Sequence, residues 1–195
     1  IGEYRAKNIV DLCKRVIEEE VPGHFLEAGV WRGGTCILMR GILEAYQIND
    51  RKVFCADSFE GLPVPDENKY PRDTGDILHT FEQLAVPLET VQENFRRYDL
   101  FDEQTVFLKG WFKDTMPTIS DETFSIIRLD GDMYGSTMDI LNNVYDSVSK
   151  GGFIVIDDYA LPTCKAAVED FREQRNICDK IYEIDWTGIW WQKNQ

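Results

Sequence analysis

The sequence has few histidines, few basic residues and no paired cysteine motif. Two histidines, His24 and His79, stand among 195 residues, and the five cysteines form no C-x-x-C pattern. An odd number of unpatterned cysteines argues against a disulfide framework or a zinc site, and free thiols suit a reducing cytoplasm, where we expect the protein to act. No Ser-His or Cys-His arrangement is visible, so catalysis through a covalent enzyme intermediate is not indicated.

The shortage of basic residues also limits the classes of partner. Lysine and arginine total 21 against 35 aspartates and glutamates, which gives a formal net charge of −14. Such a charge repels nucleic acid and anionic membranes, so neither is an expected partner. No apolar run reaches transmembrane length, and the 43% apolar content suits one globular domain over residues 1–195. The chain starts at Ile1 rather than methionine, so a leader or N-terminal segment can precede it.

Apolar runs alternate with segments of helical periodicity along the chain. Helical spacing marks residues 9–17, 35–46, 91–98, 138–148 and 163–175. The fourth of these helices is expected to begin at Ser136 or Thr137 and to be ended by the pair Gly151-Gly152. Continuous apolar runs mark strands at 24–28, 52–57, 105–109, 124–129 and 153–157. This alternation predicts an α/β fold with a Rossmann-like, doubly wound, mostly parallel sheet. Two closing runs, 180–185 and 188–192, flank a tight turn and predict an antiparallel pair at one edge, for seven strands in all.

The first predicted strand leads into a glycine-bearing turn, EAGVWRGGT, at residues 27–35. This turn lacks the G-x-G-x-x-G pattern, and Thr35 stands where a P-loop requires lysine, so nicotinamide, flavin and triphosphate ligands are disfavoured. Its glycines and the following helix N-terminus are typical of a ligand cradle. A plain tight turn explains the same residues equally well.

Four of the predicted strands end in or near an acid: Glu27, Asp57, Asp130 and Asp157. Ligands of doubly wound sheets bind beyond the carboxyl ends of the strands, so these acids predict a site along one sheet edge. Asp57, followed by Ser58, suits the hydroxyls of a ribose; a loop-capping acid is the alternative.

Trp111 and Phe112 follow the third predicted strand. Their rings could stack on a purine at the same edge, or belong to the hydrophobic core.

Asp130, Asp157 and Asp158 form the sharpest group of candidate ligands. Clustered carboxylates repel one another, and a divalent cation with oxygen ligands, Mg²⁺, Ca²⁺ or Mn²⁺, would remove the repulsion. Helix capping or pairing with basic residues is the alternative, and Asp132 suits a turn or an N-cap. The proline-bearing residues 61–80 predict a long loop that acts as a lid.

Several blocks in order resemble the macrocin O-methyltransferase (TylF-type) family of class I S-adenosylmethionine-dependent methyltransferases. The blocks are FLEAGVWRGGTCILMRGIL, ADSFEGLP, VQENF, FLKGWFKDTMP, RLDGDMYGST and GGFIVIDDY. The family methylates sugar hydroxyls of macrolides and related natural products, and it carries more chain before the first helix. The resemblance implies roles for individual residues: the amino-acid end of the cofactor at Glu27, Gly29 and Thr35, its ribose at Asp57 and Ser58, its adenine at Gly110, Trp111 and Phe112, and Mg²⁺ at Asp130, Asp157 and Asp158.

The resemblance implies a Mg²⁺-dependent O-methyltransferase with a small-molecule acceptor. A bound cation lowers the pKa of a coordinated hydroxyl, and Asp130 would accept the proton and also touch the cofactor. The alternatives are the same chemistry on a phenol or catechol, a nicotinamide-dependent dehydrogenase, or a non-catalytic domain that binds the cofactor. The sequence leaves the acceptor unnamed, and it leaves open whether the chain forms a homo-oligomer.

Overall fold

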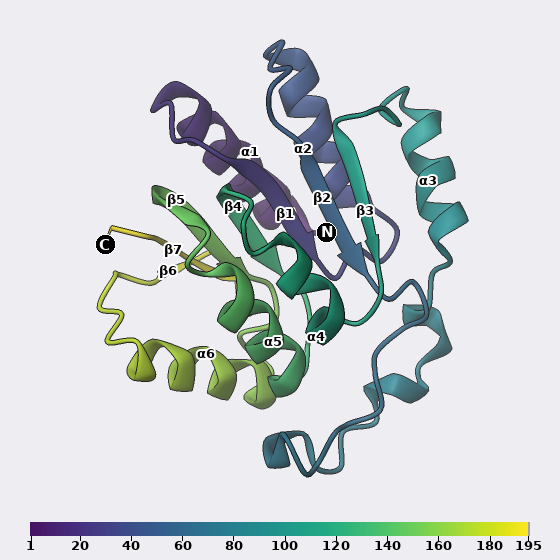
Figure 1. The fold of residues 1–195 in the computed structure, drawn as a ribbon, viewed down its shortest axis with the longest axis vertical. Helices are drawn as coiled ribbons and strands as arrows, with labels where there is room; N and C mark the ends of the chain where they lie inside the picture. Colours follow the sequence, from purple (N-terminus) through teal and green to yellow (C-terminus); the bar gives the residue numbers. More distant parts are fainter. Residues whose placement is uncertain (195) are drawn as a thin grey trace.

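A seven-stranded sheet forms the centre of the protein (Figure 1). The computed structural model describes residues 1–194, so the predicted domain 1–195 extends one residue, Gln195, beyond the described part. The strand order within residues 1–194 is β3-β2-β1-β4-β5-β7-β6. Order and direction confirm the predicted doubly wound α/β sheet with an antiparallel edge pair.

The parallel part of the sheet consists of five strands. They are β1 (His24–Ala28), β2 (Val53–Asp57), β3 (Thr105–Lys109), β4 (Phe124–Leu129) and β5 (Val148–Ile156). In register, Glu27 lies between Cys55 of β2 and Arg128 of β4. The carboxyl ends of β1, β2 and β4 therefore lie at one edge of the sheet, as the terminal acids predict. The strands β6 (Tyr182–Glu183) and β7 (Ile189–Gln192) pair antiparallel with each other, and β7 also runs antiparallel to β5.

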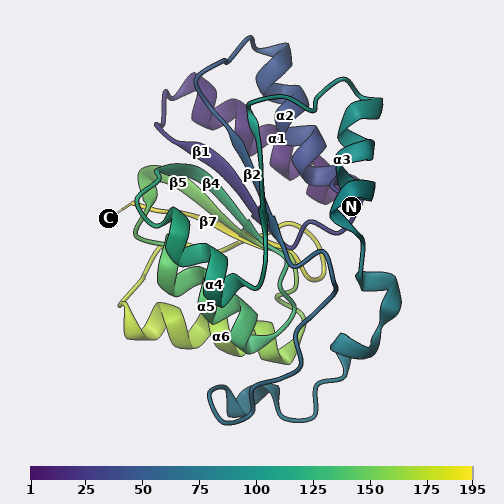
Figure 2. The same cartoon turned by 45° about the vertical axis from the view of Figure 1, so that its right-hand side comes forward.

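α-Helices cover both faces of the sheet (Figure 2). One face carries α1 (Glu3–Glu18), α2 (Gly34–Ala45) and α3 (Leu88–Arg97), and the other carries α4 (Phe112–Thr115), α5 (Tyr134–Val144) and α6 (Pro162–Gln174). The buried residues of α6 recur at helical spacing, from Cys164 through Ala167 and Val168 to Phe171, and this spacing gives the helix one apolar face. Two buried clusters result, one on each side of the sheet.

Helix α5 differs from its prediction at both ends. It begins at Tyr134 rather than near Ser136, because a carboxylate from a distant segment caps its first amides, as described below. It ends at Val144, well before the predicted stop at Gly151 and Gly152. The glycine pair lies inside β5 instead. The pairing of β4 with β5 shifts register between Phe124 and Ile126, which absorbs the extra residues and keeps them in the sheet.

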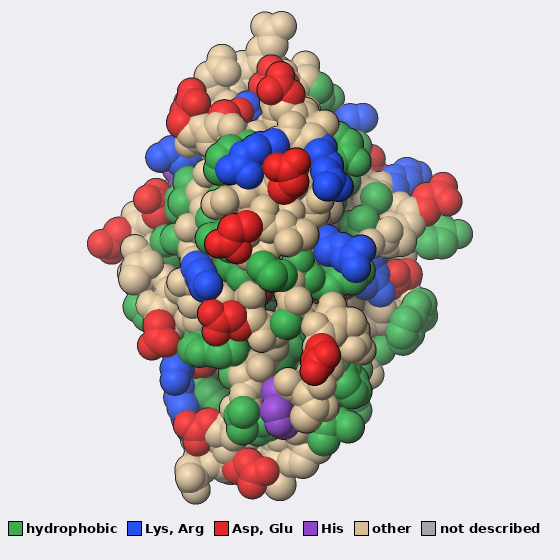
Figure 3. Space-filling model, turned by 90° about the vertical axis from the view of Figure 1, so that its right-hand side faces the viewer, with side chains coloured by type: hydrophobic (Ala, Val, Ile, Leu, Met, Phe, Trp, Pro, Cys, Tyr) green, Lys and Arg blue, Asp and Glu red, His purple; other side chains and the backbone are tan. Residues whose placement is uncertain are grey.

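Residues 61–80 connect β2 toward α3 and contain two short 3-10 helices, Pro71–Asp73 and Leu78–Thr80. The first of these packs against α5, and the segment runs past the lower end of the sheet in Figure 1. On the face that Figure 3 shows, acidic and basic side chains are interspersed with hydrophobic ones, so the negative charge forms no single patch there. No helix within residues 1–194 combines the length and the apolarity needed to cross a membrane.

Candidate active site

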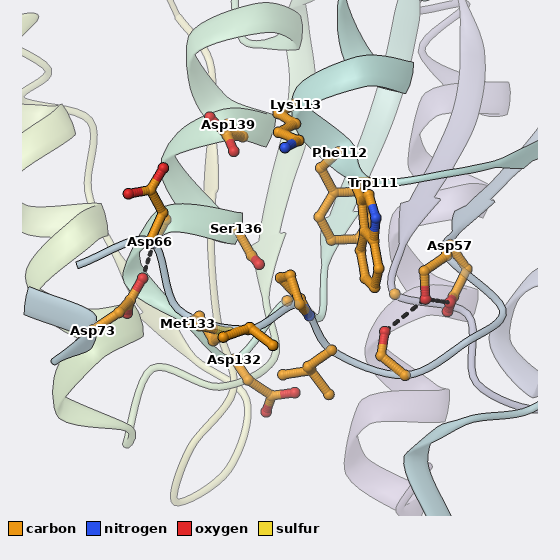
Figure 4. Close-up of a pocket in the computed structure, with 18 of the residues that line it drawn as sticks. Asp57, Asp66, Asp73, Trp111, Phe112, Lys113, Asp132, Met133, Ser136 and Asp139 are labelled. Atoms are coloured by element: carbon orange, nitrogen blue, oxygen red, sulfur yellow. Dashed lines mark hydrogen bonds between the residues drawn. The ribbon is translucent and has the colours of Figure 1, made fainter. Parts of the chain in front are cut away.

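A cavity of about 560 Å³ opens at the carboxyl ends of the strands, between the sheet edge and residues 61–80. Gly29, Asp57 and Asp130 contribute the strand ends, and Trp111 and Phe112 contribute one wall. Figure 4 shows Asp57 on one side of this space and Asp73 on the other, with Trp111, Met133 and Asp132 between them. The cavity therefore lies where a doubly wound sheet binds its ligands.

Gly29 permits the close approach of two strand ends. Its φ is +96°, and a Cβ added there would lie 1.8 Å from the carbonyl oxygen of Asp130. Any side chain at position 29 would force β1 and β4 apart at the floor of the cavity. The glycine of the turn is thus a requirement of the site.

Asp57 organises the turn beside it. Its Oδ2 accepts hydrogen bonds from the backbone amides of Val30 (2.7 Å) and Trp31 (3.2 Å), and its Oδ1 accepts one from the amide of Phe59 (2.7 Å). Carboxylate oxygens have further lone pairs, so a fixed Asp57 can still accept from ligand hydroxyls. Ser58 is buried, and its hydroxyl donates to the carbonyl oxygen of Gly61 (2.6 Å).

Gly110, Trp111 and Phe112 follow β3 and line the cavity. Trp111 precedes α4, and both aromatic rings are only partly buried, so they are available to a ligand. A partly exposed aromatic wall beside a carboxylate that can accept from hydroxyls suits a purine nucleoside.

Arg128, on β4, gathers three acids beneath the cavity. Its guanidinium contacts Glu27 (2.5 Å), Asp130 (2.8 Å) and Asp157, and its side chain is 3% exposed. Burial alone would lower the pKa of Arg128, but Asp130, Glu27 and Asp157 raise it above its ordinary value. Arg5, on α1, contacts the other oxygen of Asp157. The positive charges of these two arginines compensate much of the negative charge on the strand-end acids.

Glu27 and Thr35 lie behind the cavity wall rather than in it. Glu27 is 1% exposed and bonded to Arg128, and the thiol of Cys36 donates to its other oxygen (2.7 Å). Burial raises the pKa of Glu27 to about 7. Among the described residues, neither Glu27 nor Thr35 lines the cavity, so a direct contact of either with a cofactor remains a prediction.

Asp130, Asp132 and Asp158 converge on one point. Each offers a carboxylate oxygen, and these oxygens lie within 4.8 Å of one another. Burial and then the charge of Asp130 raise the pKa of Asp132 to about 7 and that of Asp158 to about 9. This geometry is that of a set of oxygen ligands for a hard divalent cation.

One member of the predicted ligand set, Asp157, lies apart from these three oxygens. Asp157 has both carboxylate oxygens on arginines, one on Arg5 and one on Arg128, and it stands outside the group of converging oxygens. Asp132, which the sequence analysis assigned to a turn or an N-cap, contributes an oxygen to that group. Asp157 therefore pairs with two basic residues that are remote in sequence. Pairing with basic residues is the alternative that the sequence analysis left open.

Other cavity residues were missed by the sequence analysis, some on α5 and some in residues 61–80. Lys69, Tyr70 and Asp73 line the cavity beside Ser136 and Asp139 of α5. The helical residues share one face at a spacing of three, a polar pattern that could have been read from the sequence. The conformation of residues 61–80 could not have been read from the sequence.

The family model for macrocin O-methyltransferase (TylF) matches residues 1–193. The chain is 47% identical over 197 residues to mycinamicin III 3''-O-methyltransferase of Micromonospora griseorubida, covering all of this chain and 78% of that protein. It is 46% identical to a Streptomyces olivaceus enzyme, 8-demethyl-8-(2,3-dimethoxy-alpha-L-rhamnosyl)-tetracenomycin-C 4'-O-methyltransferase, covering 98% and 74%. The structure of the O-methyltransferase NovP superposes with a TM-score of 0.97 at 49% identity, covering all of this chain and 81% of that one.

Proposed function

The chain belongs to the macrocin O-methyltransferase (TylF) family and is an O-methyltransferase, and from this we propose that it transfers a methyl group from S-adenosylmethionine to a sugar hydroxyl of a natural product. The observation that carries this proposal is one cavity lined by Asp57, by the aromatic wall and by Asp130 and Asp132 of the carboxylate cluster. A nucleoside site and a proton-accepting site thus share one space. We expect the reaction to occur in the cytoplasm.

The acceptor class rests on the relatives. The Streptomyces olivaceus enzyme is named for a rhamnosyl compound, and its sequence aligns along nearly the whole of this chain. The cavity also has a polar far end, with Asp66, Lys69 and Asp139 on its wall. Hydroxyl-rich sugars need such donors and acceptors.

The cofactor would lie across the carboxyl ends of β1, β2 and β3. Asp57 would accept from the ribose hydroxyls, and Trp111 and Phe112 would cover the adenine. Gly29 leaves the backbone open to the amino-acid end. S-adenosylmethionine supplies an electrophilic methyl group, whose bonding electrons remain on sulfur when the methyl leaves.

The carboxylate cluster fits Mg²⁺. Its donors are all oxygens, Asp158 and Asp132 are partly buried, and their mutual repulsion is not relieved by Arg128, which contacts Asp130 and Asp157. Asp130, Asp132 and Asp158 would hold the ion. Bound Mg²⁺ would lower the pKa of an acceptor hydroxyl near it.

Asp130 would act as the base. Its side chain is 32% exposed at the cavity, and Arg128 fixes one of its oxygens at 2.8 Å. The acceptor proton would move to this carboxylate while the acceptor oxygen bonds to the methyl carbon. The cavity walls would hold oxygen and carbon about 3–3.5 Å apart and in line.

Mass spectrometry of acceptor panels tests the proposal. The protein is incubated with S-adenosylmethionine, Mg²⁺ and either glycosylated natural products or simple catechols, with an Asp130→Asn variant as control. We expect a mass gain of one methyl on a sugar, with S-adenosylhomocysteine released and no product from the variant. Methylation confined to catechols would overturn the acceptor class.

A further inference from the structure

The N-terminus of helix α5 is capped by a residue that is distant from it in sequence. Asp73, in residues 61–80, is 1% exposed, and its two carboxylate oxygens accept hydrogen bonds from the amides of Tyr134 and Gly135, both at 2.8 Å. The residue at the local N-cap position, Met133, supplies no side-chain cap. A carboxylate over two free amides at a helix N-terminus is a favourable arrangement for both.

The lid segment, residues 61–80, fits closely against the same helix. Tyr70 donates from its hydroxyl to Asp139 Oδ1 (2.5 Å), and Lys69 Nζ lies 3.0 Å from that oxygen. A Cβ added at Gly135 would lie 2.4 Å from the Tyr70 ring, so only glycine leaves room for the contact. Asp73 and Tyr70 thus form a latch between the lid segment and α5.

The latched helix end directly follows the residues that carry the carboxylate cluster. Asp130 and Asp132 lie in the four residues before Tyr134, and Asp132 has a φ of +57°. The Asp132 amide lies 3.4 Å from Asp158 Oδ2, and its carbonyl oxygen accepts from Thr163 Oγ1 (3.2 Å). A left-handed aspartate is held there by its surroundings, and the start of α5 is one of them.

We propose that Asp73 is a positioning residue for methyl transfer. By capping α5, Asp73 couples closure of the lid segment to the correct placement of Asp130 and Asp132. The inference rests on the proposed function. Closing the lid excludes water from the acceptor, and the same two hydrogen bonds set the helix end that anchors the carboxylates. A displacement of about 1 Å at such groups lowers the rate about a hundredfold.

Substitution at the latch tests this with a matched control in the same segment. Asp73→Asn keeps the shape but offers one acceptor oxygen where two amides donate. Glu67→Gln makes the same chemical change at an exposed carboxylate that accepts a 3.4 Å hydrogen bond from the amide of Gly75, inside the segment. We expect Asp73→Asn to lower kcat about tenfold to a hundredfold, to raise the Mg²⁺ concentration for half-maximal rate, and to speed tryptic cleavage after Lys69. Glu67→Gln should match the wild type in all three.

A second variant disturbs the latch through a substitution in α5. Gly135→Ala suits a helix better than glycine does, but its methyl group would meet the Tyr70 ring. We expect its melting temperature to stay at or above the wild-type value while cleavage after Lys69 accelerates. Because this proteolysis is done without acceptor, a methyl group that merely obstructs the cavity would leave it unchanged.

The outcomes separate the latch from the proposed function. Unchanged cleavage in both Asp73→Asn and Gly135→Ala would overturn the latch, as would faster cleavage with unaltered kcat and Mg²⁺ requirement. Calorimetry with S-adenosylhomocysteine should show affinity within about twofold of wild type for Asp73→Asn, because the latch lies across the cavity from Asp57. Wild-type protein that binds no S-adenosylhomocysteine and methylates nothing would refute the proposed function, and with it the positioning role.

Discussion

At the scale of single residues, Asp57 is the clearest test of cofactor binding. Three backbone amides fix its carboxylate, and the residue lines the cavity. Asp57→Ala should lose hydrogen bonds to a charged group, worth roughly 1.5–3 kcal/mol, or about tenfold to over a hundredfold in affinity. Calorimetry with S-adenosylhomocysteine measures this, with circular dichroism to confirm folding. Unchanged affinity in a folded variant would remove Asp57 from the cofactor site.

Asp157 and Asp158 are adjacent in sequence yet should respond differently to the same substitution. Asp157→Asn weakens the pairing of two arginines whose side chains are 18% and 3% exposed, and should cost about 3 kcal/mol of unfolding free energy. Asp158→Asn removes a carboxylate from a repulsive cluster, so it should spare stability and raise the Mg²⁺ requirement. Urea unfolding and Mg²⁺ titrations of activity distinguish the two. The reverse pattern would restore Asp157 as the ligand.

At the scale of elements, the lid segment should respond to ligands. Several of its contacts with α5 and α6 are polar and partly exposed, as in the pair of Arg72 with Asp170, so it should open more readily than the sheet. We expect S-adenosylhomocysteine with an acceptor to slow tryptic cleavage after Lys69 severalfold. Equal cleavage with and without ligands would leave residues 61–80 as an ordinary loop.

His24, at the start of β1, should make the free energy of unfolding depend on pH. Burial lowers the pKa of His24, beside Glu122, Lys52 and Arg51, and its Nδ1 accepts from the amide of Lys52 (3.1 Å). A lowered folded pKa means that this stability is present above about pH 6.5, the value for unfolded histidine, and is lost as the pH falls through the folded value. His24→Asn retains a δ-position acceptor without titrating. Its unfolding free energy should fall less than the wild-type value between pH 7 and 5.

At the scale of the whole molecule, the cation should stabilise the fold. Asp130, Asp132 and Asp158 come from the ends of β4 and β5 and repel one another in the metal-free protein. Saturating Mg²⁺ should raise the melting temperature by linkage, and EDTA should abolish methyl transfer until Mg²⁺ is restored. A variant with asparagine at all three positions is the control, and its melting temperature should not respond. Full activity in excess EDTA would contradict the proposed role of a divalent cation.

The sequence by itself determined the fold and the edge at which the site lies. Continuous apolar runs between helical segments dictate a parallel sheet covered on both faces, and a parallel sheet brings its carboxyl ends together. Gly29, Asp57 and Asp130 therefore lie at the cavity where the sequence predicts them. These are consequences of local periodicity and chain direction, which need no knowledge of distant contacts.

Tertiary structure alone decided which partner each acid meets. Asp157 and Asp158 are equivalent in sequence, but one faces Arg5 and Arg128 and the other faces Asp130 and Asp132. Asp73 begins α5 two residues earlier than its own sequence indicates, from 61 residues away. Ion pairs and helix caps depend on side chains that converge from separate elements. Their partners are fixed only when the sheet, the helices and residues 61–80 have packed together.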